Sequence, residues 1–92
     1  MKRFKNKDLK KWAKAAIKNL YDISTYKAAL VKIEPTGPVC YLFPKEGADI
    51  YKVVFTMVSK GKVVVGGNAI HIKGKKQVAT KTFVINKGSV ST

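Results

Sequence analysis

Lysine is the residue type that dominates the chemistry available to this chain. Its 92 residues carry 19 cationic side chains, all of them lysine except Arg3, against five acids, so the net charge is +14 at pH 7. Charge of one sign opposes compaction, and solubility alone needs a net charge of only about 2 to 8 in magnitude. The excess therefore predicts an anionic partner that offsets the repulsion.

The shortage of arginine indicates how such a partner would be held. Arginine reads guanine through a bidentate fork, whereas the lysine ammonium acts as a point charge on phosphate. We therefore expect contacts to a phosphate backbone, with little sequence specificity. The candidate contacts are a helical set, Lys7, Lys10, Lys11, Lys14 and Lys18, and a turn set, Lys60, Lys62, Lys73, Lys75 and Lys76.

The turn lysines would form one cluster if their two turns lie at the same end of the sheet. Exposed aromatic rings often accompany such lysines in proteins that bind single strands, because bases stack on the rings. The candidate rings are Tyr26, Tyr41, Phe43 and Tyr51. A domain of this size also needs aromatic rings for its core, so packing is the competing interpretation of each ring.

Few residues have the types and spacing of a catalytic site, which requires convergent titratable groups. His71 is the only histidine, and its two isoleucine neighbours favour a surface or partly packed ring. Glu46 and Asp49 offer two carboxylates to a metal, but their place in a loop favours solvation. The sequence therefore predicts a protein that is not an enzyme.

Cysteine and glycine usage excludes further kinds of site. Cys40 is the only cysteine, so the chain can form neither an internal disulfide nor a multi-cysteine metal site, and its neighbours indicate a buried, inert thiol. The glycines that follow Gly61 resemble a phosphate loop in spacing. However, Gly67 and Asn68 stand where such a loop requires a lysine and a hydroxyl residue. We expect no cofactor and no metal.

One amphipathic helix over residues 7–21 is predicted to position the first set of lysines. Its apolar residues recur at helical spacing and are Leu9, Trp12, Ala13, Ala16, Ile17 and Leu20. Asn6 is the expected N-cap. The lysines lie opposite this stripe, where the pairs 7/11, 10/14 and 14/18 are like charges one turn apart. Each pair is unfavourable by roughly 0.2 to 0.5 kcal/mol in an isolated helix.

After Asp22 the chain changes to β-branched and aromatic runs separated by turn residues. Strands are predicted at 26–33, 39–43, 50–58, 62–65, 69–72 and 77–85. Gly66, Gly67 and Asn68 are expected to form either a bulge or a tight bend that redirects the strand. In the third strand, alternation assigns Tyr51, Val53, Phe55 and Met57 to the core face.

These elements predict an α+β fold, with one N-terminal amphipathic helix packed on a curled antiparallel β-meander of about five or six short strands. Residues 1–92 are expected to form a single domain, with 1–6 as a mobile basic arm and 89–92 as a loose C-terminal end. One helix cannot cover both faces of such a sheet. Either the sheet curls towards a barrel, or a second copy covers the other face in a homodimer.

The function that the sequence predicts first is nucleic-acid binding, to DNA or RNA, through the phosphate backbone. The alternative is a small viral or plasmid-type protein-interaction module that binds an acidic surface of a host or virion protein. A third interpretation is that an AT-rich coding sequence has scattered lysines over a solvated surface. Membrane binding is not expected, because the helix needs its apolar stripe to cover the sheet. The single cysteine and the lack of an apolar leader favour the cytoplasm, or the host cytoplasm for a viral protein.

Overall fold

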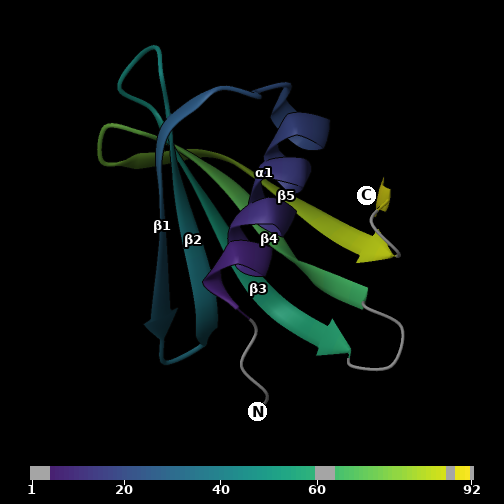
Figure 1. The fold of residues 1–92 in the computed structure, drawn as a ribbon. Coiled ribbons are helices and arrows are strands. Elements are labelled where there is room, and N and C mark those ends of the chain that lie inside the picture. Colours follow the sequence, from purple (N-terminus) through teal and green to yellow (C-terminus); the bar gives the residue numbers. More distant parts are fainter. Residues whose placement is uncertain (1–4, 60–63, 87–88, 92) are drawn as a thin grey trace.

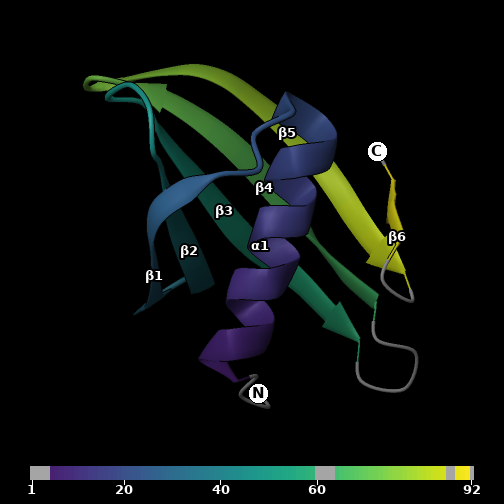
Figure 2. The ribbon, with the colours of Figure 1, turned by 45° about the horizontal axis from the view of Figure 1, so that its top comes forward.

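The structure, a computed structural model, describes residues 5–59, 64–86 and 89–91. The elements in chain order are α1 (Asn6–Tyr21), β1 (Tyr26–Glu34), β2 (Gly37–Pro44), β3 (Ile50–Ser59), β4 (Val64–Lys73), β5 (Lys76–Asn86) and β6 (Ser89–Ser91). The helix lies across one face of the sheet, and the strands curve around it (Figure 1, Figure 2). The predicted architecture of one N-terminal helix on a six-strand antiparallel meander is confirmed.

The helix begins at Asn6, one residue earlier than expected. Lys5 is the N-cap, with an extended backbone, and its carbonyl oxygen accepts bonds from the amides of Asp8 and Leu9. Asn6 was expected to cap the helix and to belong to a mobile arm, but it lies inside the first turn, where its side chain cannot cap. The helix ends at Asp22, which adopts a left-handed conformation and donates its amide to the Lys18 carbonyl.

The six strands form one antiparallel sheet in sequence order. The register places Val31 opposite Cys40, Cys40 opposite Val53 and Val53 opposite Ala69, so these residues share the face that α1 covers. The helix contacts all six strands. The strand order is linear, with β1 at one edge and β6 at the other, and these two strands do not pair. The sheet therefore curls around the helix without closing into a barrel (Figure 2).

Strand β4 joins two strands that were expected to be separate, at 62–65 and 69–72. Gly66 and Gly67 continue the strand instead of bending it. Gly67 is required by close packing, because a Cβ atom at this position would overlap the carbonyl oxygen of Val54 on β3. The predicted bend is therefore wrong, whereas an irregularity of the bulge type does occur at this point of the sheet.

The irregularity lies across from these glycines, on β3. The β3–β4 register shifts between Phe55 and Met57, as it does at a β-bulge. Tyr51, Val53 and Phe55 precede the shift and are buried as predicted, whereas Met57 is 46% exposed. Its assignment to the core was wrong, because an extra residue in the strand reverses the alternation of side chains beyond it.

The C-terminal segment is also more ordered than expected. Residues 89–91 form β6, which pairs antiparallel with β5 and places Val90 opposite Ile85. Val90 packs against the core, which explains why this segment is not the loose end predicted for 89–92. Thr92 and residues 1–4 of the predicted basic arm lie outside the described residues.

The core lies between α1 and the covered face of the sheet. It is built from Leu9, Ala13, Ala16, Ile17, Cys40, Leu42, Tyr51, Val53, Phe55, Val65, Ala69, Phe83 and Ile85. Trp12 packs against this core, and Cys40 is fully buried in it, both as expected. Val39 is buried but lies outside the cluster, because its register with Lys32 and Val54 assigns it to the opposite face. We call this opposite face the outer face of the sheet.

Candidate polyanion-binding surface

Four helix lysines gather at one hollow. Lys7, Lys10, Lys11 and Lys14 line a shallow depression of about 560 Å³ on α1. Their position follows from helical periodicity, because Leu9, Ala13, Ala16 and Ile17 point at the sheet and leave these lysines away from the core. We refer to the four residues as the lysine flank.

The lysine flank lies on the side of α1 that borders β1 and β2. The Lys14 Nζ atom is 5.9 Å from the ring centroid of Tyr26, the first residue of β1. Burial raises the pKa of the Cys40 thiol on β2 to about 11, and the charges of Lys10 and Lys14 act in the opposite direction, lowering it. The positive field of the lysine flank therefore extends into the neighbouring core.

No carboxylate neutralises the lysine flank within the described ranges. The ion pairs found there are Lys52–Glu34 and His71–Asp49, and neither uses a flank lysine. Asp8 is the acid in the first helical turn, where it complements the helix dipole. Like charges one turn apart thus have no ion-pair partner among residues 5–59, 64–86 and 89–91.

Lys18, the fifth helical candidate, has a different environment. It lies in the last turn, where the negative, carbonyl end of the helix dipole stabilises a positive charge. It lines a second hollow of about 460 Å³ together with Ala15, Asn19, Asp22 and Val90. Since Val90 belongs to β6, this hollow faces the opposite edge of the sheet from the lysine flank.

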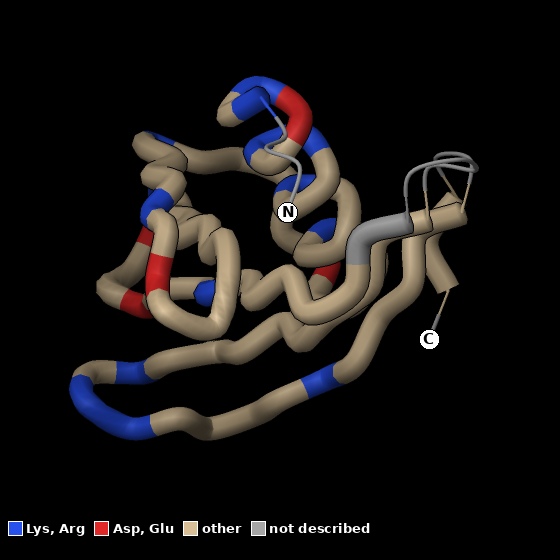
Figure 3. Tube along the Cα trace, turned by 90° about the horizontal axis from the view of Figure 1, so that it is seen from below, with Lys and Arg blue, Asp and Glu red and all other residues tan. Residues whose placement is uncertain are grey.

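The described turn lysines, Lys73, Lys75 and Lys76, do not join the helical set (Figure 3). Lys73 and Lys76 pair across the β4–β5 hairpin, and Gly74 supplies the positive φ that its tight turn requires. Figure 3 shows the lysines of this hairpin at one tip of the sheet, apart from the lysines of α1. Lys75 also lies in this turn.

Lys60 and Lys62 lie outside the described residues. The flanking ends of the chain, Ser59 and Val64, pair with each other at one end of β4, whereas the β4–β5 turn follows Lys73 at the other end. Successive turns of a meander alternate between its ends. The two predicted turn sets therefore connect to opposite ends of β4.

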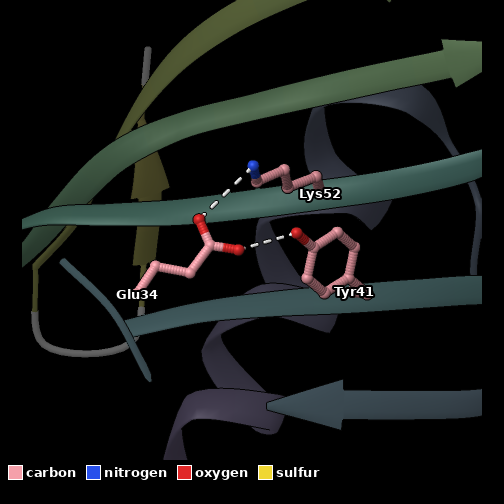
Figure 4. Close-up of polar contacts among 3 residues, drawn as sticks. All are labelled: Glu34, Tyr41 and Lys52. Atoms are coloured by element: carbon pink, nitrogen blue, oxygen red, sulfur yellow. Dashed lines mark hydrogen bonds and ion pairs between the residues drawn. The ribbon is translucent and has the colours of Figure 1, made fainter. Parts of the chain in front are cut away.

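A second group of charged residues lies on the outer face of the sheet. The Tyr41 hydroxyl donates a 2.8 Å hydrogen bond to Glu34 Oε2, and Lys52 Nζ lies 3.6 Å from Glu34 Oε1 (Figure 4). Lys32 and Lys52 lie 5.8 and 5.6 Å from the centroid of the Tyr41 ring. We call Lys32, Glu34, Tyr41 and Lys52 the outer-face cluster. Here one carboxylate and one aromatic ring compensate two cations.

Sequence reasoning missed the outer-face cluster. The available signal was alternation, which assigned Lys52 to the second face of its strand. Pairing Lys52 with Tyr41 also required the β2–β3 register. The position of Glu34 beside both residues required the β1–β2 hairpin as well.

His71 is part of a packed contact between two sheet elements. Its Nε2 atom lies 2.8 Å from Asp49 Oδ2, and its ring stacks on Tyr51 at 4.6 Å between centroids. Tyr21 packs against both rings and donates its hydroxyl to the Ala69 carbonyl. Burial raises the pKa of both tyrosines. These contacts hold the β2–β3 connection against β4 and fit the partly packed histidine that was predicted.

The candidate stacking rings differ in exposure. Tyr51 is buried, whereas Tyr26, Tyr41 and Phe43 are half-buried. Burial raises the pKa of Tyr26 to about 12, with smaller effects from Tyr51 and Cys40, and its hydroxyl donates to the Ile23 carbonyl at 2.6 Å. Tyr26 is thus the candidate ring that contacts the lysine flank, and its polar end is already bonded.

Comparison with known proteins finds no family model, no curated protein and no solved structure that matches the chain. Within residues 5–59, 64–86 and 89–91, no helix combines the length and apolar character needed to cross a membrane.

Proposed function

We propose that this protein binds nucleic acid through phosphate contacts made by the lysine flank. The observation that carries the proposal is the gathering of Lys7, Lys10, Lys11 and Lys14 at one hollow, with no carboxylate partner among the described residues. Repulsion between these ammonium groups costs the isolated helix a few tenths of a kcal/mol per pair. A phosphate backbone removes this cost and gains from counterion release.

The chemistry of the surface favours backbone contacts over base recognition. The flank residues are all lysine, whose ammonium acts as a point charge and lacks the planar fork that reads a guanine edge. The flank spans eight residues of α1, from Lys7 to Lys14, which corresponds to about 10 Å along the helix axis. A short stretch of one phosphate backbone fits this length, so binding is expected to depend on charge and not on base sequence.

Salt dependence tests this proposal quantitatively. Labelled duplex DNA, single-stranded DNA and RNA of mixed sequence are titrated with the protein at several salt concentrations, and fluorescence anisotropy gives the association constant. If the four flank lysines each neutralise one phosphate, log K falls with log salt with a slope of about −3.6 for duplex DNA and about −2.8 for a single strand. Absence of binding to all three probes at low salt would refute the proposal.

A further inference from the structure

Strand β1 presents a long, open edge. It has nine residues, and within the described chain its hydrogen-bonded neighbour is β2 alone. Every second residue of β1 directs its backbone N–H and C=O groups away from β2, which makes such an edge a template for another strand. The opposite edge of the sheet differs, because β6 covers the end of β5 and the Lys81 ammonium of β5 donates to the Leu20 carbonyl of α1.

Strand β1 has only part of the protection that is usual for an edge strand, namely two exposed lysines, Lys27 and Lys32, and an irregular start. It contains no proline, and its register with β2 shifts only at its start, between Tyr26 and Ala28. Leu30 is 46% exposed and Ile33 is 68% exposed, so β1 supplies two of the four large exposed hydrophobic residues in the described chain. Exposed apolar side chains on an unpaired edge are typical of a surface that accepts a partner strand.

The charge around this edge defines the chemistry of the partner. The lysine flank borders the edge on the helix side, where Lys14 lies over the Tyr26 ring. Lys27 and Lys32 of β1 add two exposed cations. A second copy of this chain would bring another +14 to the same place. Electrostatic complementarity therefore favours an acidic strand and disfavours self-association.

We propose that β1 binds an extended acidic segment of a partner protein by strand addition. The added strand lies about 4.8 Å beyond β1, and its side chains alternate between the two faces of the sheet. Residues that face α1 meet the ammonium groups of Lys10 and Lys14 and are acidic. Residues that face the other way lie on the outer face, which also carries Lys32 and Glu34, and they are apolar where they meet Leu30. The recognised sequence is thus one in which acidic and apolar residues alternate.

Amide hydrogen exchange measured by NMR tests strand addition directly. The probe is an end-capped peptide of nine alternating Glu and Val residues, which matches the length of β1. We expect every second amide of β1, those directed away from β2, to exchange about tenfold more slowly when the peptide is bound. A control peptide with the same composition, but with all its Glu residues placed before its Val residues, should leave β1 exchange unchanged.

Two protein variants separate the contributions of side-chain contacts and of backbone pairing to binding of the alternating peptide. The K10Q/K14Q variant should weaken binding of the alternating peptide about tenfold while keeping the alternating protection pattern at saturation. The L30K variant, at an exposed position, should weaken it by removing the apolar contact. Binding of the peptide without any change in β1 exchange would overturn the proposal, because charge alone would then hold the peptide.

The same measurement identifies the competing occupant. If β1 amides are already protected without peptide and sedimentation gives a dimer, a second copy occupies the edge and the proposal is wrong. Failure to bind the alternating peptide at low salt would overturn it as well. Neither result bears on nucleic-acid binding by the lysine flank, which does not use β1 backbone groups and is measured separately by anisotropy.

Discussion

Two groups of lysines in this protein have the same chemistry and different surroundings. In the outer-face cluster, Lys52 pairs with the carboxylate of Glu34, and Lys32 and Lys52 both lie over the ring of Tyr41. In the lysine flank, four ammonium groups line one hollow without a carboxylate partner in the described structure. The difference indicates that the number of lysines does not locate a binding surface. What matters is which lysines the fold leaves uncompensated.

The comparison is tested most directly by removing each group in turn. Replacing the flank as K7Q/K10Q/K11Q/K14Q should weaken nucleic-acid binding by about 100-fold at about 50 mM salt, because up to four phosphate contacts are lost. The matched variant K32Q/K52Q removes two compensated lysines and should change the affinity by less than about threefold. Anisotropy measures both variants, and circular dichroism verifies that each is folded. Equal losses per lysine would mean that only net charge matters.

The titration of Cys40 tests whether the charges of the lysine flank act on the core. Burial raises the pKa of Cys40 from 9.0 to about 11, so the unfolded chain loses this proton first as the pH rises. The free energy of unfolding should therefore be unaffected by Cys40 below about pH 9 and fall by roughly 2 kcal/mol between pH 9 and 11. Tyr26, with a pKa of about 12, extends the decline to higher pH. Urea unfolding across this range measures the effect.

The controls for this alkaline transition are C40A and the two lysine variants. C40A should flatten the decline between pH 9 and 11, because its side chain has no proton to lose. K10Q/K14Q should steepen the decline, since the two charges lower the thiol pKa in the folded state. K32Q/K52Q should leave it unchanged. If C40A and the original chain show the same slope, the thiol does not contribute to this transition.

The outer-face cluster can be converted towards the state of the flank by one substitution. E34Q removes the carboxylate that pairs with Lys52 and that accepts a hydrogen bond from the Tyr41 hydroxyl. Nucleic-acid affinity at low salt should rise about threefold, because Lys52 then lacks its carboxylate partner. Y41F is the matched control: it removes the hydrogen bond but keeps the carboxylate, so affinity should stay the same. A rise with Y41F equal to that with E34Q would assign the effect to loosened structure.

The smallest expected effect is on stability. Lys7 and Lys11 lie one helical turn apart, so K11Q should raise the free energy of unfolding by about 0.2 to 0.5 kcal/mol. Urea unfolding at low salt measures this gain, and added salt should abolish it, because exposed charges are screened. K32Q removes a compensated lysine and should give no gain. A loss of stability in K11Q would show that this lysine is compensated within the folded chain.

Local patterns were sufficient to predict α1 and strands β1, β2, β3 and β5. The stripe from Leu9 to Leu20 predicted α1, because residues three and four apart share a helical face. Turn residues located the ends of β1 and β2 to within one or two positions. The lysines of the flank were all named from the sequence, because a helix segregates them from its apolar stripe.

Other features depended on contacts between segments far apart in the chain. Gly67 continues β4 because the Val54 carbonyl approaches too closely for a side chain, and this approach is absent from any local pattern. Met57 is exposed because the register shifts opposite those glycines. Residues 89–91 form a strand because β5 offers a partner for it and the core accepts Val90.

The sequence by itself determined the charge, the helix and its row of lysines, and the alternating strands, since these depend on residues within one or two turns or on composition. The tertiary structure decided which cations are neutralised. Glu34 lies beside Lys52 and Tyr41 only because β1, β2 and β3 pair in one register. In contrast, no flank lysine forms an ion pair with an acid in the described chain. Coulomb energy depends on the distance between charges, and only the folded chain defines those distances.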